Sequence, residues 1–160
     1  MRAFSPHENR LLTANLNIPT RSGILALQRG EGVNELMSTG QLDKIDEYIA
    51  ADVVFRSPGE EPGHGLEAFK EACLVYDWAF PDWSMEIHDQ IAEGDKVATR
   101  YTNRATHEGE LDGIEATGNT VEVTGIMIHH FEDGTIVESI QEADNAHLLA
   151  QLGVMEGHDA

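Results

Sequence analysis

The sequence predicts an α+β fold in which a curved antiparallel sheet packs on three N-terminal helices and half-encloses an internal pocket. Helical periodicity dominates the first half of the 160-residue chain, and alternating strand patterns fill the second half. In that second half, Asp133-Gly134 separates two β-branched apolar runs, which is the strongest short-range signal of a hairpin. Helices on one face of an antiparallel sheet define the α+β class, and ligands commonly bind between the two layers.

The length of the chain allows one domain with a substantial core. Apolar residues make up 41% of the sequence, which argues against overall disorder. Residues 1–22 lack sustained periodicity, so we expect them to form an N-terminal arm. We expect a single α+β domain over residues 23–155, followed by a flexible tail at 156–160.

The helical half contains three expected helices and one short strand. The first helix is expected over residues 24–38, although its two internal glycines weaken it, and the second over 41–50. A short strand over 52–57 ends at Pro58-Gly59. The third helix is the clearest, because apolar residues from Leu66 to Phe80 form one continuous stripe before Pro81 stops it.

The second half is predicted to be a four-strand antiparallel meander that ends in a helix. Apolar and polar residues alternate along it, and Gly-containing turns separate the runs. The expected strands cover residues 85–91, 96–106, 119–131 and 135–143, and the expected last helix covers 145–153.

The charge balance restricts the possible partners. The chain has 29 acidic and 10 basic residues, which gives a net charge of −19. Such a field repels nucleic acid and anionic lipid, so we exclude both as partners. Few lysines among scattered acids fit either a protein of a high-salt cytoplasm or an ordinary acidic bacterial protein.

Other residue types point to a cytoplasmic protein without a metal centre. Cys73 is the single cysteine, which excludes a disulfide framework and a cysteine-based metal site. It falls in the apolar stripe of the third helix, so we expect it to pack rather than react. No apolar run approaches the ~18 residues that a membrane-spanning helix needs, and the N-terminus is a poor signal peptide.

Asp144 closes the last expected strand and precedes the last expected helix. Aspartate is a preferred N-cap, so one interpretation is that Asp144 caps that helix. Another is that its carboxylate lies at the inner end of a half-buried strand, across the sheet from His129-His130, and moves a proton. The residue types alone leave both interpretations open.

Several short motifs in a common order resemble the SnoaL-like polyketide cyclases, or ester-cyclase-like proteins, of the nuclear-transport-factor-2-like superfamily. The resemblance covers residues 34–153 and implies an α+β cone with an internal pocket, usually in a dimer or larger assembly. The motifs are Gly40-Gln41-Leu42-Asp43, Ala79-Phe80-Pro81-Asp82-Trp83, Glu93-Gly94-Asp95-Lys96-Val97-Ala98, Thr106-His107-Glu108-Gly109-Glu110, Ala116-Thr117-Gly118, Phe131-Glu132-Asp133-Gly134-Thr135-Ile136-Val137-Glu138 and Gln151-Leu152-Gly153.

The resemblance also implies an activity and two catalytic residues. Members of known activity close a ring by intramolecular aldol condensation, without metal or cofactor. Their aspartate acid/base matches Asp144, and a supporting histidine matches His130 by spacing. His129 is the alternative if a bulge shifts the strand, and a simple two-residue hairpin also places His129 on the face of Asp144.

Further residues are candidates for contact with substrate. Arg100 and Asn103 could stabilise an enolate together with His130, although a surface ion pair for Arg100 and a strand-surface place for Asn103 and Tyr101 are the simpler interpretations. His107 is expected in an exposed loop at the pocket mouth. Ile140 stands where members often have Trp, which alters the expected pocket wall. Core or pocket wall is expected for four aromatic residues: Phe55, Tyr76, Trp78 and Trp83.

Three functions follow as alternatives. The first is a cofactor-free lyase or isomerase that moves a proton on a carbonyl-bearing, apolar small molecule. The second is an epoxide or ester hydrolase, which would need Arg100 paired with Glu142 or Glu86 in the pocket. The third is a non-catalytic, dimeric small-molecule-binding module. We expect a homodimer through the outer face of the sheet, because β-branched and aromatic residues occupy both faces of the meander.

Overall fold

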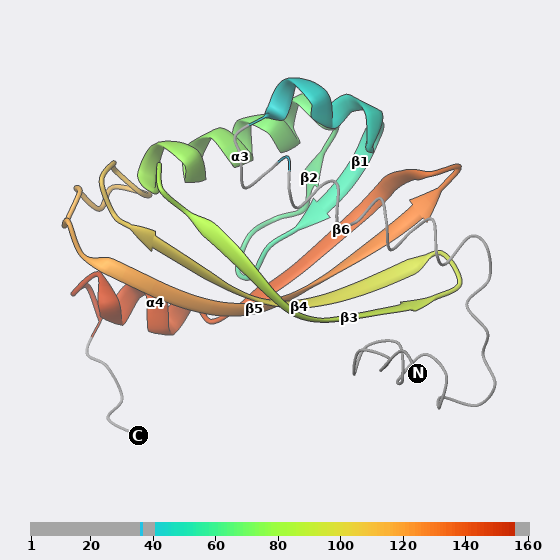
Figure 1. The fold of residues 1–160 in the computed structure, drawn as a ribbon. Helices are drawn as coiled ribbons and strands as arrows, with labels where there is room; N and C mark the ends of the chain where they lie inside the picture. The colour runs from blue at the N-terminus through green and yellow to red at the C-terminus, as the bar shows by residue number, and fades with distance from the viewer. Residues whose placement is uncertain (1–35, 37–40, 156–160) are drawn as a thin grey trace, which may run out of the picture.

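The computed structural model describes residue 36 and residues 41–155, which form a curved, unclosed six-stranded sheet with helices on it (Figure 1). The strand order is β2-β1-β6-β5-β4-β3. The arm at 1–22, the tail at 156–160 and, apart from residue 36, the helix at 24–38, all expected from the sequence, lie outside the described residues. The α+β class is confirmed.

The four C-terminal strands form the expected antiparallel meander. Strands β4 and β6 have the expected bounds, whereas β3 and β5 differ from the expected ranges by one or two residues at their ends. These strands are β3 (Ser84–Glu93), β4 (Lys96–Thr106), β5 (Thr120–Glu132) and β6 (Thr135–Ala143). At the β5–β6 turn both Asp133 and Gly134 have positive φ angles, 48° and 80°, as a type I′ hairpin turn requires.

The N-terminal half departs from prediction. The expected helix at 41–50 is only a 3-10 helix, η1 (Leu42–Glu47), and the chain then enters strand β1 (Ile49–Arg56) three residues earlier than expected. Strand β1 pairs parallel with β6, so the sheet is mixed rather than wholly antiparallel. A two-residue strand, β2 (Gly63–His64), pairs with β1 in the segment between the expected strand at 52–57 and the expected third helix.

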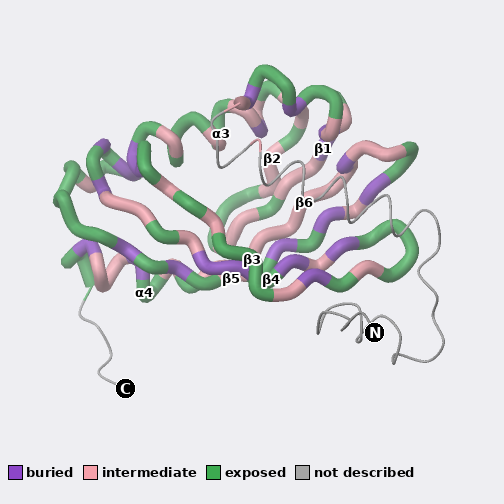
Figure 2. Tube along the Cα trace, in the orientation of Figure 1, coloured by how far each residue is buried: buried purple, intermediate pink, exposed green. Residues whose placement is uncertain are grey.

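Helix α3 (Leu66–Ala79) crosses the concave face of the sheet, and the short helix α4 (Asn145–Gln151) packs on β5 at the far end (Figure 1). Most of the buried hydrophobic residues form two clusters. Figure 2 colours buried residues purple, and many of them lie on the strands of the sheet. One cluster packs η1, β1 and the start of α3 against the β5–β6 hairpin, and the other packs α4 and the end of α3 against β4 and β5. No helix in the described ranges combines the length and apolarity that crossing a bilayer requires.

Candidate functional site

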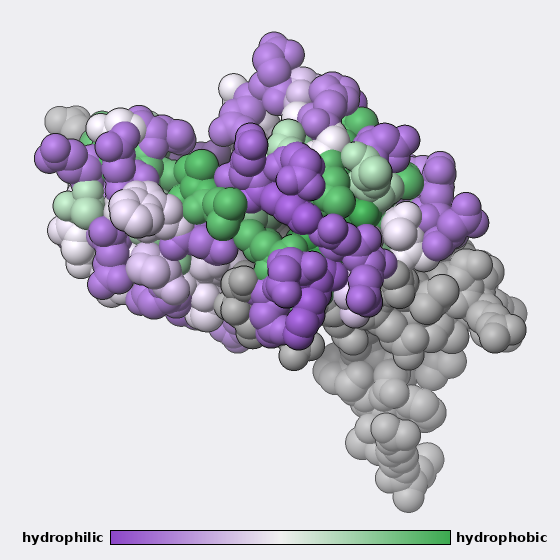
Figure 3. Space-filling view, turned by 90° about the horizontal axis from the view of Figure 1, so that it is seen from above, coloured by the Kyte–Doolittle hydropathy of each residue, from purple (hydrophilic) through white to green (hydrophobic). Residues whose placement is uncertain are grey.

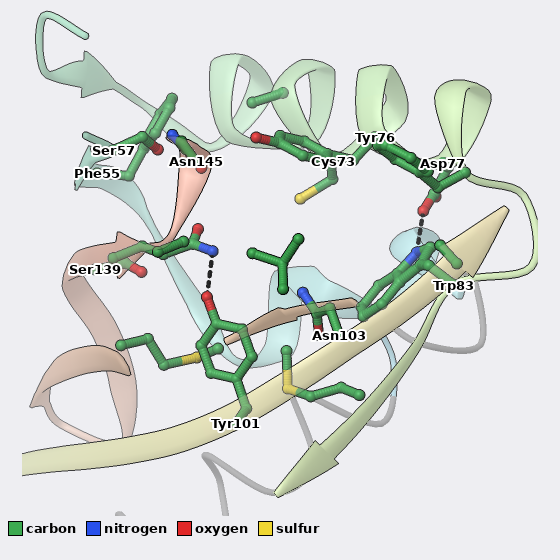
Figure 4. Close-up of a pocket in the computed structure, with 18 of the residues that line it drawn as sticks. Phe55, Ser57, Cys73, Tyr76, Asp77, Trp83, Tyr101, Asn103, Ser139 and Asn145 are labelled. Atoms are coloured by element: carbon green, nitrogen blue, oxygen red, sulfur yellow. Dashed lines mark hydrogen bonds between the residues drawn. The ribbon is translucent and has the colours of Figure 1, made fainter. Parts of the chain in front are cut away.

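A cavity of about 170 Å³ lies between α3 and the concave face of the sheet (Figure 4). Viewed from above, apolar residues lie in a hollow that hydrophilic residues border (Figure 3). The walls are mostly apolar, which suits a small molecule with few polar groups. The polar or charged residues among those that line the cavity are Arg56, Ser57, Cys73, Tyr76, Asp77, Tyr101, Asn103, His129, Ser139, Gln141 and Asn145.

Alternation along the inner strands decides which side chains reach the cavity. Successive side chains of a strand point to opposite faces of a sheet, so either the odd-numbered or the even-numbered residues of a strand line the cavity. On the three central strands that parity is odd: Tyr101, Asn103 and Ala105 on β4, Val121, Val123, Met127 and His129 on β5, and Ser139, Gln141 and Ala143 on β6.

Tyr101 is the largest fully buried side chain, and its phenol faces the cavity. Its oxygen accepts a 2.5 Å hydrogen bond from Nε2 of Gln141, shown dashed in Figure 4. Burial raises the pKa of Tyr101, and the hydrogen bond from Gln141 opposes that rise. The strand-surface place expected for Tyr101 is therefore wrong, because Tyr101 has the inward parity of β4.

The histidine that faces the cavity is His129. Strand β6 has one extra residue, Val137, between the pairs Phe131–Ile136 and His130–Glu138. His129 faces the cavity because it shares the parity of the other lining residues of β5, whereas His130 points away from it. The bulge instead shifts β6, so that Ser139 lies opposite His129 and the odd-numbered residues of β6 after Val137 face the cavity. Burial lowers the pKa of His129 to about 4, so its imidazole is neutral at pH 7. No hydrogen bond joins its ring to another side chain in the described part of the chain.

Asp144 lies at the N-cap of α4, as the capping interpretation predicted. Its carboxylate accepts a hydrogen bond from the backbone N–H of His147 over 3.0 Å. The side chain is exposed and is absent from the cavity wall, although its neighbours Ala143 and Asn145 both line that wall.

The two residues that the resemblance paired are far apart. His130 lies opposite Glu138, six residues before Asp144 on the same strand, which corresponds to on the order of 20 Å at the usual strand rise. His129 lies opposite Ser139, on the order of 15 Å from Asp144 by the same measure. Asp144 and His130 are therefore not brought together.

Asp77 is the carboxylate that lines the cavity within the described residues, and sequence reasoning missed it. It belongs to the last turn of α3, and its Oδ1 accepts a 2.8 Å hydrogen bond from Nε1 of Trp83. An acid in the last helical turn opposes the helix dipole, and this local conflict was the signal available in the sequence. Cys73, one turn earlier, has its pKa raised to about 12 by burial and by Asp77.

Asn103 lines the same cavity wall with a carboxamide whose oxygen has no hydrogen-bond partner among the described residues. That oxygen, Oδ1, is buried, and no other hydrogen bond of its side chain involves a described residue. A buried polar group without a partner is costly, so a ligand that contacts this amide gains binding energy.

The remaining predicted contact residues divide into two groups. Phe55, Tyr76 and Trp83 line the cavity, whereas Arg100 is exposed on the outer face and Ile140 has the outward parity of β6. Trp78 is 71% exposed, so its expected place in the core or pocket wall is wrong: it lies on the side of α3 away from the sheet.

His107 is fully buried, which corrects the expected exposed loop residue. Its ring packs on Phe80 at 5.4 Å, and its Nδ1 accepts a 3.2 Å hydrogen bond from the backbone N–H of Thr117. The ring is thereby held behind the cavity wall rather than in it. No cluster of three or more His, Cys, Asp or Glu residues with the arrangement of a metal site occurs in the part of the chain that the structure describes.

Known proteins share this fold. The family model for SnoaL-like polyketide cyclases matches residues 30–152. IdmH of Streptomyces antibioticus, a candidate polyketide cyclase, is 33% identical over 81% of this chain and 99% of its own, with a TM-score of 0.71. No curated protein matches the chain.

Two further solved structures are similar at lower identity. AclR of Streptomyces galilaeus, a candidate hydroxylase, is 26% identical over 84% of this chain and 85% of its own, with a TM-score of 0.76. TsrD of Streptomyces laurentii is 26% identical over 82% of this chain and 97% of its own, with a TM-score of 0.74.

The sheet, the cavity and these matches define one class of protein, an α+β cone with a pocket between its sheet and helix. The chain belongs to the SnoaL-like polyketide cyclase family, since the family model covers more than half of it and a relative is more than 30% identical over most of both chains.

Proposed function

We propose that the protein is a cofactor-free cyclase that transfers protons on a carbonyl-bearing, largely apolar small molecule bound in the cavity. The observation that carries this proposal is the cavity itself. It is mostly apolar, and a few isolated polar groups, among them Asn103, His129 and Tyr101, face into it. Family membership supports the same reaction class.

The proposed chemistry is an intramolecular aldol closure. A carboxylate takes the proton α to a carbonyl, the C–H electron pair forms a C=C bond, and the carbonyl π pair moves to oxygen. The enolate carbon then attacks a second carbonyl, and the new alkoxide takes the proton back from the carboxylic acid. Neutral imidazole can stabilise the enolate oxygen as a hydrogen-bond donor, which is a role for His129.

Two carboxylates are proposed as the proton acceptor. Asp144 matches the family's acid/base by its place in the sequence, and it would have to leave its helix cap to reach the substrate. Asp77 already lines the cavity, with one carboxylate oxygen held by Trp83. Replacing each by asparagine separates these assignments, since asparagine keeps the shape and removes the base.

The hydrolase alternative has less support. It was expected to pair Arg100 with Glu142 or Glu86 in the cavity, and all three are exposed and absent from the cavity wall. Arg56 and Asp77 do line the cavity, but Arg56 faces Glu138 at 3.7 Å and Asp77 is hydrogen-bonded to Trp83. A binding module without catalysis uses the same cavity, and only a measurement of turnover distinguishes it from a cyclase.

Exchange of α-hydrogens tests the proposal without knowledge of the natural substrate. The bicyclic ketone 1-tetralone is incubated with protein in D₂O, and the C2 proton signal is followed by NMR. We expect catalysed loss of that signal above the buffer rate, and loss of the catalysis when the responsible carboxylate becomes asparagine. Binding of 1-tetralone without exchange would contradict proton transfer and favour the binding module.

A further inference from the structure

We propose that the phenol of Tyr101 is the hydrogen-bond donor that binds the ligand's carbonyl oxygen. Gln141 and Gly125 orient this phenol towards the cavity. This inference rests on the proposed function, because it takes the cavity as the binding site. It assigns to Tyr101 both recognition of a ketone and stabilisation of the oxygen that becomes negative when the α-proton leaves.

The hydrogen-bond pattern of Tyr101 leaves its proton unused. Gln141 donates from Nε2 to the phenol oxygen, so that oxygen acts as the acceptor in this bond. A phenol also has one O–H to donate. No further hydrogen bond of Tyr101 to a described residue exists, and the side chain lines the cavity. The cavity is therefore where the O–H finds an acceptor.

The register of the sheet leaves space for the phenol. Gly125 of β5 pairs with Tyr101 of β4 and with Ala143 of β6. A Cβ at Gly125 would overlap the phenol oxygen of Tyr101 and the backbone oxygen of Glu142. Only glycine at this position lets the tyrosine ring lie flat across β5 and reach Gln141 on the next strand.

The protonation state suits a donor. Burial raises the pKa of Tyr101, so the phenol keeps its proton throughout the neutral range. Arg56 is the cation that lines the cavity among the described residues, and it faces Glu138 at 3.7 Å. A neutral carbonyl oxygen, rather than a carboxylate, is therefore the acceptor that this wall accommodates.

The test compares two probes that differ only in the carbonyl: 1-tetralone and tetralin. Dissociation constants are measured by NMR titration for wild-type protein, Tyr101→Phe and Tyr48→Phe. Tyr48 packs on the core outside the cavity wall, so Tyr48→Phe is a matched control for loss of a phenol oxygen. We expect the preference for 1-tetralone over tetralin to fall roughly tenfold in Tyr101→Phe, the size of one lost hydrogen bond, and to persist in Tyr48→Phe.

A spectroscopic readout separates recognition from packing. The C=O stretch of bound 1-tetralone should lie at lower wavenumber in wild-type protein than in Tyr101→Phe, because a hydrogen bond weakens the carbonyl bond. Since Phe leaves the Gln141 amide without its partner, the double variant Tyr101→Phe/Gln141→Leu removes both groups and protects the fold. It should show the same unshifted stretch.

The outcomes distinguish this inference from the function on which it rests. If both probes bind and neither the preference nor the stretch changes in Tyr101→Phe, the assignment of Tyr101 is overturned while the cavity remains the binding site. If neither probe binds wild-type protein, the proposed binding function of the cavity is overturned, and the role of Tyr101 with it.

Discussion

The Asp144 carboxylate accepts a hydrogen bond from the backbone N–H of His147 over 3.0 Å and thereby caps helix α4. The same residue is the family's expected acid/base, so one side chain has a structural role that is visible and a chemical role that is proposed. Substitutions can separate the two, because several residue types cap a helix, but among them only aspartate has a carboxylate that can accept a proton.

We predict that Asp144→Asn and Asp144→Ser both lose α-hydrogen exchange while keeping the stability of the wild-type protein within a few tenths of a kcal/mol. Both residues are good N-caps, whereas Asp144→Ala should lose about 1 kcal/mol of unfolding free energy. Urea denaturation and the exchange assay give the two readouts. Full exchange activity in the asparagine and serine variants would leave Asp144 as a cap alone.

Asp77 is the other carboxylate proposed as the base, and a separate substitution tests it. Asp77→Asn keeps a hydrogen-bond acceptor for Nε1 of Trp83 but removes the negative charge from the cavity. If Asp77 takes the proton, exchange falls by a factor of 100 or more, within the usual range for a general base, while 1-tetralone still binds. Trp83→Phe is the control that loses the hydrogen bond and retains the carboxylate. Equal exchange in wild-type protein and Asp77→Asn would remove Asp77 from the mechanism.

His129 should make stability depend on pH. Its pKa is lowered by burial to about 4 in the folded protein, against an ordinary value near 6.5 in the unfolded chain. Between those values the unfolded chain binds more protons, so the free energy of unfolding falls as the pH drops from about 6.5 towards 4. The loss from this residue amounts to at most roughly 3 kcal/mol.

Urea denaturation at several pH values checks this expectation. Other groups also titrate in the window, so the informative quantity is the difference in slope between wild-type protein and His129→Gln. The variant should show the shallower fall between pH 6.5 and 4, even if it is less stable at pH 7. Identical slopes would show that the His129 ring is solvated or paired in solution.

The outer face of the sheet is the expected dimer interface, and several β-branched and aromatic residues of the meander do not contribute to it. Val97, Tyr101, Val121 and Val123 are buried on the inner face. The outer face instead has a row of register partners that crosses four strands: Ile91, Ala98, Ile128 and Ile140.

We predict that Ile128→Lys converts the dimer into a monomer at micromolar concentration. Ile91 and Ile128 are 49% and 38% exposed, so the row offers apolar area that a second copy would cover. Analytical ultracentrifugation of wild-type protein, Ile128→Lys and Leu74→Lys measures the effect. Leu74 is an exposed apolar residue of α3, away from this face, and its variant should remain dimeric. A monomeric wild-type protein would contradict the interface.

Stability should rise with salt. The net charge is −19, and the excess acidic side chains repel one another more strongly in the compact state than in the unfolded chain. The Debye length falls from ~30 Å at 0.01 M to ~3 Å at 1 M, so added salt removes this repulsion. We expect the Tm to rise between 0.05 and 2 M in both sodium chloride and potassium chloride. A flat curve in both salts would indicate that the acids are well dispersed or locally paired.

Much of the local structure was predictable because it depends on near neighbours in the chain. The apolar stripe from Leu66 to Phe80 marks α3, and Asp133-Gly134 marks the hairpin, since only positive φ angles at both residues close that turn. For Phe55, Tyr76 and Trp83 the sequence left core and pocket wall open, and in the structure all three line the cavity.

The tertiary structure decided what depends on distant partners. Residues 49 and 50 were expected to end a helix but begin strand β1, because β6, more than 80 residues later, supplies a parallel neighbour. The extra residue Val137 turns the odd-numbered residues Ser139, Gln141 and Ala143 of β6 to the cavity, and no local pattern marks that bulge. Tyr101 meets Gln141 only because Gly125 lies between their strands. The periodicity of a segment depends on its own residues, so the sequence predicts it. Strand register and pairing depend on the packing of the whole sheet, and they determine which side chains line the cavity.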